Sequence, residues 1–135
     1  MKKNLVIVLL VLLVDITMYN PEVNQTDSTP FITASNKQVK TGYCATSRDL
    51  KKKYKLEYGD LVVIPMLNMC LEIQDIMNKR YTDRIDIFSF SKQEAIKFGV
   101  KKQIGVFIIR KKDMKKEMIL LKNKQKEQQD KKWQR

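Results

Sequence analysis

Short apolar runs separated by polar turns make up most of the chain. Leu61–Ile64 predicts a buried strand that ends at Pro65, and Ile104–Ile109 predicts a final strand. Apolar and polar residues alternate around Ile73 and around Asp86, with the period of half-buried strands. The pattern therefore predicts a mainly β domain.

One short helix is marked by its two ends. Ser91 and Glu94 have the spacing of a capping box, in which the first side chain accepts a hydrogen bond from the backbone of the second. Apolar residues continue to Phe98, and Gly99 supplies a stop. Further on, Met114, Met118 and Leu121 recur at helical spacing and predict a short amphipathic stretch.

The charge of the chain is large and uneven. The formal net charge is +12, which suits an anionic partner such as nucleic acid, acidic lipid or a bacterial wall polymer. Residues 111–135 contain ten lysines or arginines and four acidic residues, a net charge of +6. This tail is either an interaction arm or, as is common at chain ends, a solvated and partly frayed helix.

The N-terminal segment resembles an export signal. Met1–Asn4 is basic, and Leu5–Val14 is an unbroken run of ten apolar residues, short of the roughly 20 that a membrane span needs. No small-residue cleavage site follows Val14. The run is therefore a cleaved signal, an uncleaved anchor or a buried strand.

At 135 residues the chain has room for one compact domain. We expect residues 1–14 to be the signal-like segment, residues 15–110 the domain and residues 111–135 the tail.

Several enzyme classes are excluded by composition. The chain has no histidine, which removes Ser-His and Cys-His catalysis and leaves few zinc ligands, so we expect neither a metal nor a cofactor. Its two cysteines, Cys44 and Cys70, are either buried free thiols or, in an exported protein, a disulfide between neighbouring strands. Any catalysis must use carboxylates.

Three aspartates lie in characteristic frames. They are Asp49 in Ser-Arg-Asp-Leu, Asp75 in Glu-Ile-Gln-Asp, and Asp86 in Arg-Ile-Asp-Ile-Phe. Considered one at a time, Asp49 and Asp75 are also typical of residues that cap a helix or begin a turn. In this order, and with eleven residues from Asp75 to Asp86, they resemble the three-aspartate (3D) domain family, which includes the barrel of membrane-bound lytic transglycosylase A and stationary-phase muralytic proteins.

The resemblance extends from about Ile16 to Ile109 and implies a fold and an activity. The fold is a six-stranded double-psi β-barrel, here with one or two short helices and the basic C-terminal tail. The activity is that of a peptidoglycan lytic transglycosylase, which cleaves between N-acetylmuramic acid and N-acetylglucosamine and forms a 1,6-anhydro ring. One carboxyl serves as acid and then as base.

The resemblance also assigns roles to residues. Asp86 matches the catalytic acid and Asp75 the supporting carboxylate, whose like charge would raise the pKa of Asp86. Asp49 matches the first family aspartate, with a role in positioning the other two.

Four further residues are candidates for substrate binding. Thr29 and Thr33 lie in segments that resemble the substrate side of the groove in such relatives. Lys79 and Arg80 lie where better-known members have a glycine-rich loop; the glycines are absent here, and these cations are suited to holding a muramyl or peptide-stem carboxylate.

The sequence thus leaves two functions open. The first is a murein-cleaving enzyme, exported or anchored at the cell envelope through Leu5–Val14, of bacterial or phage origin. The second is a non-catalytic wall-binding or virion-structural module on the same barrel. We do not expect nucleic-acid binding, because the aromatic residues are scattered and form no base-stacking motif.

Overall fold

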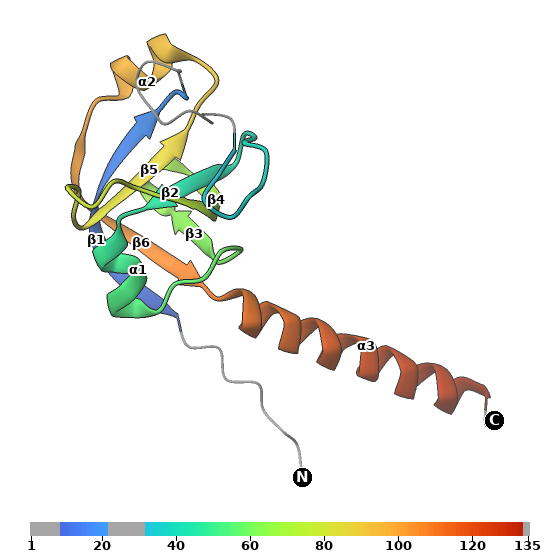
Figure 1. The fold of residues 1–135 in the computed structure, drawn as a ribbon. Helices are drawn as coiled ribbons and strands as arrows, with labels where there is room; N and C mark the ends of the chain where they lie inside the picture. The colour runs from blue at the N-terminus through green and yellow to red at the C-terminus, as the bar shows by residue number, and fades with distance from the viewer. Residues whose placement is uncertain (1–8, 22–31, 134–135) are drawn as a thin grey trace.

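Six strands form one closed barrel in the computed structural model, which describes residues 9–21 and 32–133 (Figure 1). The strands are β1 Leu10–Tyr19, β2 Tyr43–Thr46, β3 Leu61–Ile64, β4 Met69–Ile76, β5 Arg84–Phe88 and β6 Lys101–Ile109. Around the barrel the order is β1-β5-β2-β4-β3-β6, and β6 closes on β1. The pairs β1/β5 and β2/β4 are parallel and the other pairs are antiparallel. The prediction of a mainly β, six-stranded barrel is confirmed.

Side chains fill the interior of the barrel. Each strand alternates between a core side and an outer side, so β-branched residues from all parts of the sheet meet inside. The fully buried ones include Ile16, Val62, Ile73, Ile85 and Val106, all at 0 % exposure. Burying such a side chain contributes about 1.5–3 kcal/mol, and this shared core fixes which face of every strand points outward.

β1 begins inside the apolar N-terminal run. Leu12 and Val14 point into the core, with 6 % and 2 % exposure, and pair with Val106 and Ile104 of β6. Residues 10–14 are therefore part of the barrel, so the expected domain start at residue 15 falls within a strand. Residues 1–8 lie outside the described residues, and export remains a prediction. Among the helices of the described residues, none is long and apolar enough to span a membrane.

Three α-helices accompany the barrel: α1 Arg48–Tyr54, α2 Lys92–Phe98 and α3 Lys111–Trp133, with a 3₁₀ turn at Pro65–Leu67. The capping box that opens α2 is confirmed, because the Ser91 side chain accepts from the Glu94 backbone N–H at 3.1 Å. α3 accounts for the described part of the basic tail, has no buried residue, and projects away from the barrel (Figure 1).

The root of α3 is tied to the turn before β3. Asp60, which is 1 % exposed, accepts hydrogen bonds from the backbone N–H of Glu57 at 2.8 Å and of Lys111 at 2.9 Å. The Arg110 guanidinium donates to the carbonyl oxygen of Tyr54 at 2.9 Å. The first turn of α3 therefore has a fixed position relative to the barrel, although the helix beyond it is exposed.

The place of β1 in the barrel is testable with two adjacent leucines. Leu12→Ala should lower the free energy of unfolding by about 2–3 kcal/mol, because it opens a cavity in the core. Leu13→Ala is the matched control: Leu13 is 66 % exposed, so its loss should cost less than about 0.5 kcal/mol. Urea unfolding of both variants measures the difference. Equal, small effects would show that this segment is not a barrel strand.

Candidate functional site

Two of the three aspartates lie in one row across the outer face of the barrel. β2 lies between β4 and β5, and Ala45 of β2 is the register partner of both Asp75 and Asp86. Thr17 of β1 pairs with Asp86 on its other side. Since adjacent strands are about 4.8 Å apart, the Cα atoms of the two aspartates are separated by about 10 Å. The row is therefore Thr17, Asp86, Ala45, Asp75.

A register shift turns Asp75 outward. Ile73 points into the core, and strict alternation would place Asp75 there too. The pairing instead steps from Cys44–Ile73 to Ala45–Asp75, which leaves Gln74 as an extra residue in β4. Gln74 is 1 % exposed, and its Oε1 has no hydrogen-bond partner among the described residues. The sequence pattern alone does not indicate this bulge, which brings Asp75 to the face of Asp86.

Asp86 has the properties of a carboxyl that titrates near neutral pH. Burial raises its pKa to about 6 from the ordinary value of 3.8. The Thr17 hydroxyl, which donates to Asp86 Oδ1 at 2.8 Å, and the positive charge of Arg84 lower the pKa, while the charge of Asp75 raises it further. Burial outweighs the two stabilising partners, so Asp86 is partly protonated around pH 6.

Asp75 acts as a hydrogen-bond acceptor that holds surrounding segments. Its Oδ1 accepts from the backbone N–H of Ala34 and from that of Ile76, both at 2.9 Å. Its Oδ2 accepts from the Tyr19 hydroxyl at 3.3 Å. Ser35 N–H also donates to the Gln74 carbonyl at 3.2 Å. These bonds fix the segment around residues 33–38 against the outer end of β4, beside the carboxylate row.

Tyr19 and Thr17 belong to the site although sequence reasoning missed them. Burial raises the pKa of Tyr19, and the charges of Asp75 and Asp86 raise it further, so the phenol stays protonated and remains a donor. Its ring packs edge-on against Phe88 at a centroid distance of 5.8 Å. A sequence signal was present: Thr17 and Tyr19 alternate with the core residue Ile16, on the side that faces outward.

Asp49 lies apart from the row and acts on β5 through its backbone. It is in the first turn of α1 rather than on a strand, and its Oδ2 accepts from the Asp83 N–H at 3.0 Å. Slight burial raises the pKa of Asp49, but hydrogen bonds from Ser47 and from the Asp83 backbone outweigh this and hold it below 3.8. Asp83 immediately precedes β5, so Asp49 fixes the start of the strand that carries Asp86.

The four expected substrate-binding residues differ in how they are placed. Thr29 lies outside the described residues. Thr33 is 4 % exposed, and its hydroxyl is used within its own turn, with Ser35 Oγ at 2.8 Å and the Lys37 N–H at 3.1 Å. Lys79 and Arg80 are exposed in the loop that joins β4 to β5, the two strands that carry the aspartates.

The loop after Asp75 is ordered by an aromatic side chain instead of glycines. The Arg80 guanidinium donates to the Tyr81 hydroxyl at 2.9 Å and lies 4.8 Å from the ring centroid. Arg84 lies 5.1 Å from the same centroid. Two cations therefore share one aromatic ring in and beside the loop between β4 and β5, and each contact contributes about 0.5–1 kcal/mol.

Neither cysteine forms a disulfide in this structure. Cys44 is buried, and burial raises the pKa of its thiol, which keeps it protonated and unreactive. Cys70 is a free thiol too, but it is exposed on the outer face of β4, so the expectation of two buried thiols is wrong for this residue. Within the described residues, no group of three or more cysteine, aspartate and glutamate side chains is close enough to hold a metal ion.

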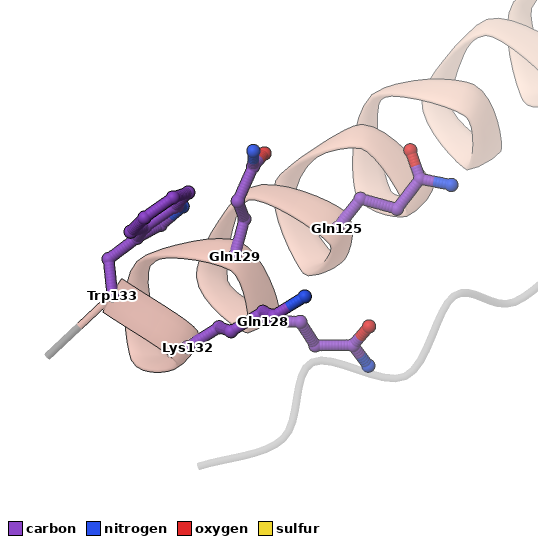
Figure 2. A pocket seen from close by; sticks show the side chains of 5 residues that line it. All are labelled: Gln125, Gln128, Gln129, Lys132 and Trp133. Carbon is purple, nitrogen blue, oxygen red and sulfur yellow. The ribbon is translucent and has the colours of Figure 1, made fainter. Parts of the chain in front are cut away.

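A surface hollow of about 350 Å³ lies far from the carboxylates in the sequence, near the end of α3 (Figure 2). Its lining residues are Gln125, Gln128, Gln129, Lys132 and Trp133. All five belong to one exposed helix, and Trp133 is 78 % exposed, so no second helix or strand among residues 9–21 and 32–133 encloses the space. We assign no ligand to it.

No protein-family model matches the chain, and a search of the curated proteins finds no match. We therefore infer the chemistry of the site from the positions and the protonation of its residues. One carboxyl that gains and loses a proton near pH 6 lies beside a second carboxyl and a protonated phenol on an outer face. This arrangement is suited to general acid–base chemistry on a polar substrate lying across the strands.

The raised pKa of Asp86 predicts a pH-dependent cost in stability. A carboxyl whose pKa is higher in the folded state than in the unfolded state stabilises the fold below about pH 4 and loses this contribution as the pH rises to about 6. Asp86→Asn should therefore stabilise the protein by about 1–3 kcal/mol at pH 7 and by little at pH 4. Chemical unfolding across this pH range measures the effect.

Asp49→Asn is the control with the opposite sign. Because the pKa of Asp49 is lowered, this replacement should reduce stability at neutral pH, and the difference should vanish in acid. An Asp86→Asn variant that shows no pH-dependent gain would contradict the burial of that carboxyl.

Two neighbours should move the pKa of Asp86 in opposite directions. Thr17→Val removes the hydroxyl that favours the charged carboxylate, so the pKa should rise above about 6. Asp75→Asn removes a like charge, so the pKa should fall. Carboxyl-carbon NMR titration reads both shifts directly. Shifts of the same sign in the two variants would show that Asp75 and Asp86 do not interact in this row.

Proposed function

We propose that the barrel is a double-psi barrel of the three-aspartate (3D) family and that it acts as a peptidoglycan lytic transglycosylase. Two features support the fold: its two parallel strand pairs, and the placement of β2 parallel to β4 but antiparallel to β5. The observation that carries the function is Asp86, a partly buried carboxyl with a pKa of about 6 in the frame of the family's catalytic acid.

The proposed reaction needs one carboxyl in two successive states. Protonated Asp86 donates to the glycosidic oxygen between N-acetylmuramic acid and N-acetylglucosamine, and the bond from that oxygen to the muramyl C1 breaks. Ionised Asp86 then takes the proton of the muramyl C6 hydroxyl, whose oxygen forms the new bond to C1. Asp86 ends protonated, as it began, and no water is consumed.

The other residues have supporting roles in this proposal. Asp75 holds Tyr19 and the Ala34 segment in place and adds the negative charge that favours protonated Asp86. Asp49 positions the start of β5. Lys79 and Arg80 are exposed at the loop beside the row and are available for a muramyl or peptide-stem carboxylate. The protein would work at the cell envelope, exported or anchored, in a bacterium or for a phage.

A second candidate function is a binding module without chemistry, on a cell wall or in a virion. One observation favours it: both oxygens of Asp75 are used by neighbouring segments, including the Tyr19 hydroxyl, which brings an aromatic ring to the row. A strand face ordered in this way can hold a glycan without cleaving it. Activity on murein decides between the two functions.

The decisive experiment uses murein sacculi and the full chain. The wild-type protein should release anhydro-muropeptides, detected by mass spectrometry, with activity that falls above about pH 6 as the acid loses its proton. Asp86→Asn should lower the rate by at least about 10²-fold, because an amide cannot donate and recover a proton. Asp130→Asn, in exposed α3, makes the same charge change away from the row and should keep full activity.

Three outcomes are informative. An Asp86→Asn variant with nearly normal activity would remove Asp86 from the acid role. Wild-type protein that sediments with sacculi but releases nothing would favour the binding module. Absence of both binding and release would refute the murein proposal.

A further inference from the structure

The outer face of β1, β6 and β3 is apolar where a water-facing sheet would be polar. Val11 pairs with Phe107, Phe107 with Val63, and Val63 with Cys70, so one apolar row crosses four strands. Leu9 and Leu13 extend the row along β1. We call Leu9, Val11, Leu13, Val63 and Phe107 the outer strip.

The outer strip is accessible to solvent in the single chain. Leu9, Val11 and Leu13 are 52 %, 60 % and 66 % exposed, and Phe107 is 36 % exposed. Val63 is half-buried on the same face. A one-sided antiparallel sheet normally places polar residues outside, and a contiguous apolar patch there marks an interaction surface.

A concentration of positive charge lies at the same end of the barrel. Leu10 pairs with Ile108, only three residues before α3 begins at Lys111. Figure 1 shows the start of β1 and the root of α3 at this end, with α2 at the other. The helix contains nine lysines and four acidic residues, a net charge of +5, and its first turns carry the exposed residues Lys112, Lys115 and Lys116.

We propose that the outer strip and the first turns of α3 together bind the surface of an anionic lipid bilayer. Apolar side chains enter the boundary between headgroups and acyl chains, while the lysines meet the anionic headgroups. Residues of β1 contribute from a barrel strand, through their outward side chains alone, because Leu12 and Val14 are in the core.

Two other kinds of partner are each complementary to only one part of this surface. A nucleic acid or another polyanion matches the lysines but leaves the apolar strip exposed. A second copy of the chain covers the strip but, in a symmetric pair, brings two helices of charge +5 toward one another. An anionic bilayer is complementary to both the strip and the helix.

The experiment measures sedimentation of the full chain with vesicles. Binding should be strong to phosphatidylcholine vesicles that contain phosphatidylglycerol, weak to phosphatidylcholine alone, and reduced by salt. Val11→Thr with Leu13→Thr should weaken binding about tenfold, since it removes apolar area while placing β-branched threonine, which favours strands, at both positions. Replacing Lys112, Lys115 and Lys116 by Gln should weaken it about fivefold per lysine.

Matched controls come from α2, at the opposite end of the barrel. Ile96→Thr removes a side chain that is 71 % exposed, and Lys97→Gln removes one exposed positive charge; both should bind as the wild type does. Leu9→Ser lies before β1 begins, so it should weaken binding about threefold without affecting the fold, even where the double threonine variant unfolds.

Several results would overturn the proposal. Equal effects of the strip and α2 replacements would remove the strip from the contact. A dimer in analytical ultracentrifugation that the strip variants dissociate would assign the surface to a second copy. Binding to an oligonucleotide that is as tight as binding to anionic vesicles and indifferent to the strip would assign the lysines to a polyanion. None of these readouts depends on murein cleavage.

Discussion

The position of β2 between β4 and β5 is the constraint on which the candidate site depends. It makes Ala45 the common neighbour of Asp75 and Asp86, and alanine has a side chain too small to separate the two carboxyls. The bulge at Gln74 is the second requirement, because without it Asp75 would share the core side with Ile73. A strand order and one extra residue thus create the carboxylate row.

Placing Asp86 in this row has an energetic cost that the fold only partly offsets. A hydrogen bond from a neutral hydroxyl to a charged carboxylate contributes about 1.5–3 kcal/mol, and the Thr17 hydroxyl supplies one. The pKa of Asp86 still rises to about 6, so the increase in pKa caused by burial is larger than the decrease caused by Thr17 and Arg84. A residue that lowers stability at neutral pH is typical of a functional position, where stability and activity compete.

Features that depend on residues close in sequence were predicted correctly, whereas features that depend on which strands pair were not. The capping box at Ser91 and the strand Leu61–Ile64 depend on residues close in sequence, and both are present in the structure. The bulge at Gln74 depends on which strand lies beside β4, which no local pattern encodes. The six-stranded barrel was predictable only through the resemblance to a family.

The limits of local patterns are clearest at two further residues. The apolar run Leu5–Val14 fits a signal as well as a strand. Pairing with β6 shows that residues 10–14 form a strand, and export stays a prediction. Tyr19 is remote in sequence from Asp75, and its hydroxyl reaches that carboxyl because β1, β5, β2 and β4 are neighbours in that order.

β1 carries two surfaces of different character on one outward face. Val11 and Leu13 are apolar and exposed, whereas Thr17 and Tyr19 bond to carboxylates. Asp15 lies between them and is held by Lys102 Nζ and by the Gln103 N–H, both at 3.1 Å.

The distance between these two surfaces bears on the chemistry of the candidate site. Four residues of extended strand place Thr17 about 13 Å from Leu13. This exceeds the Debye length of about 8 Å at physiological ionic strength, so an anionic surface at the outer strip acts only weakly on Asp86 through solvent. Screening is smaller through the protein interior, and the effect there has the same sign as that of Asp75, because a negative potential raises the pKa of a carboxyl.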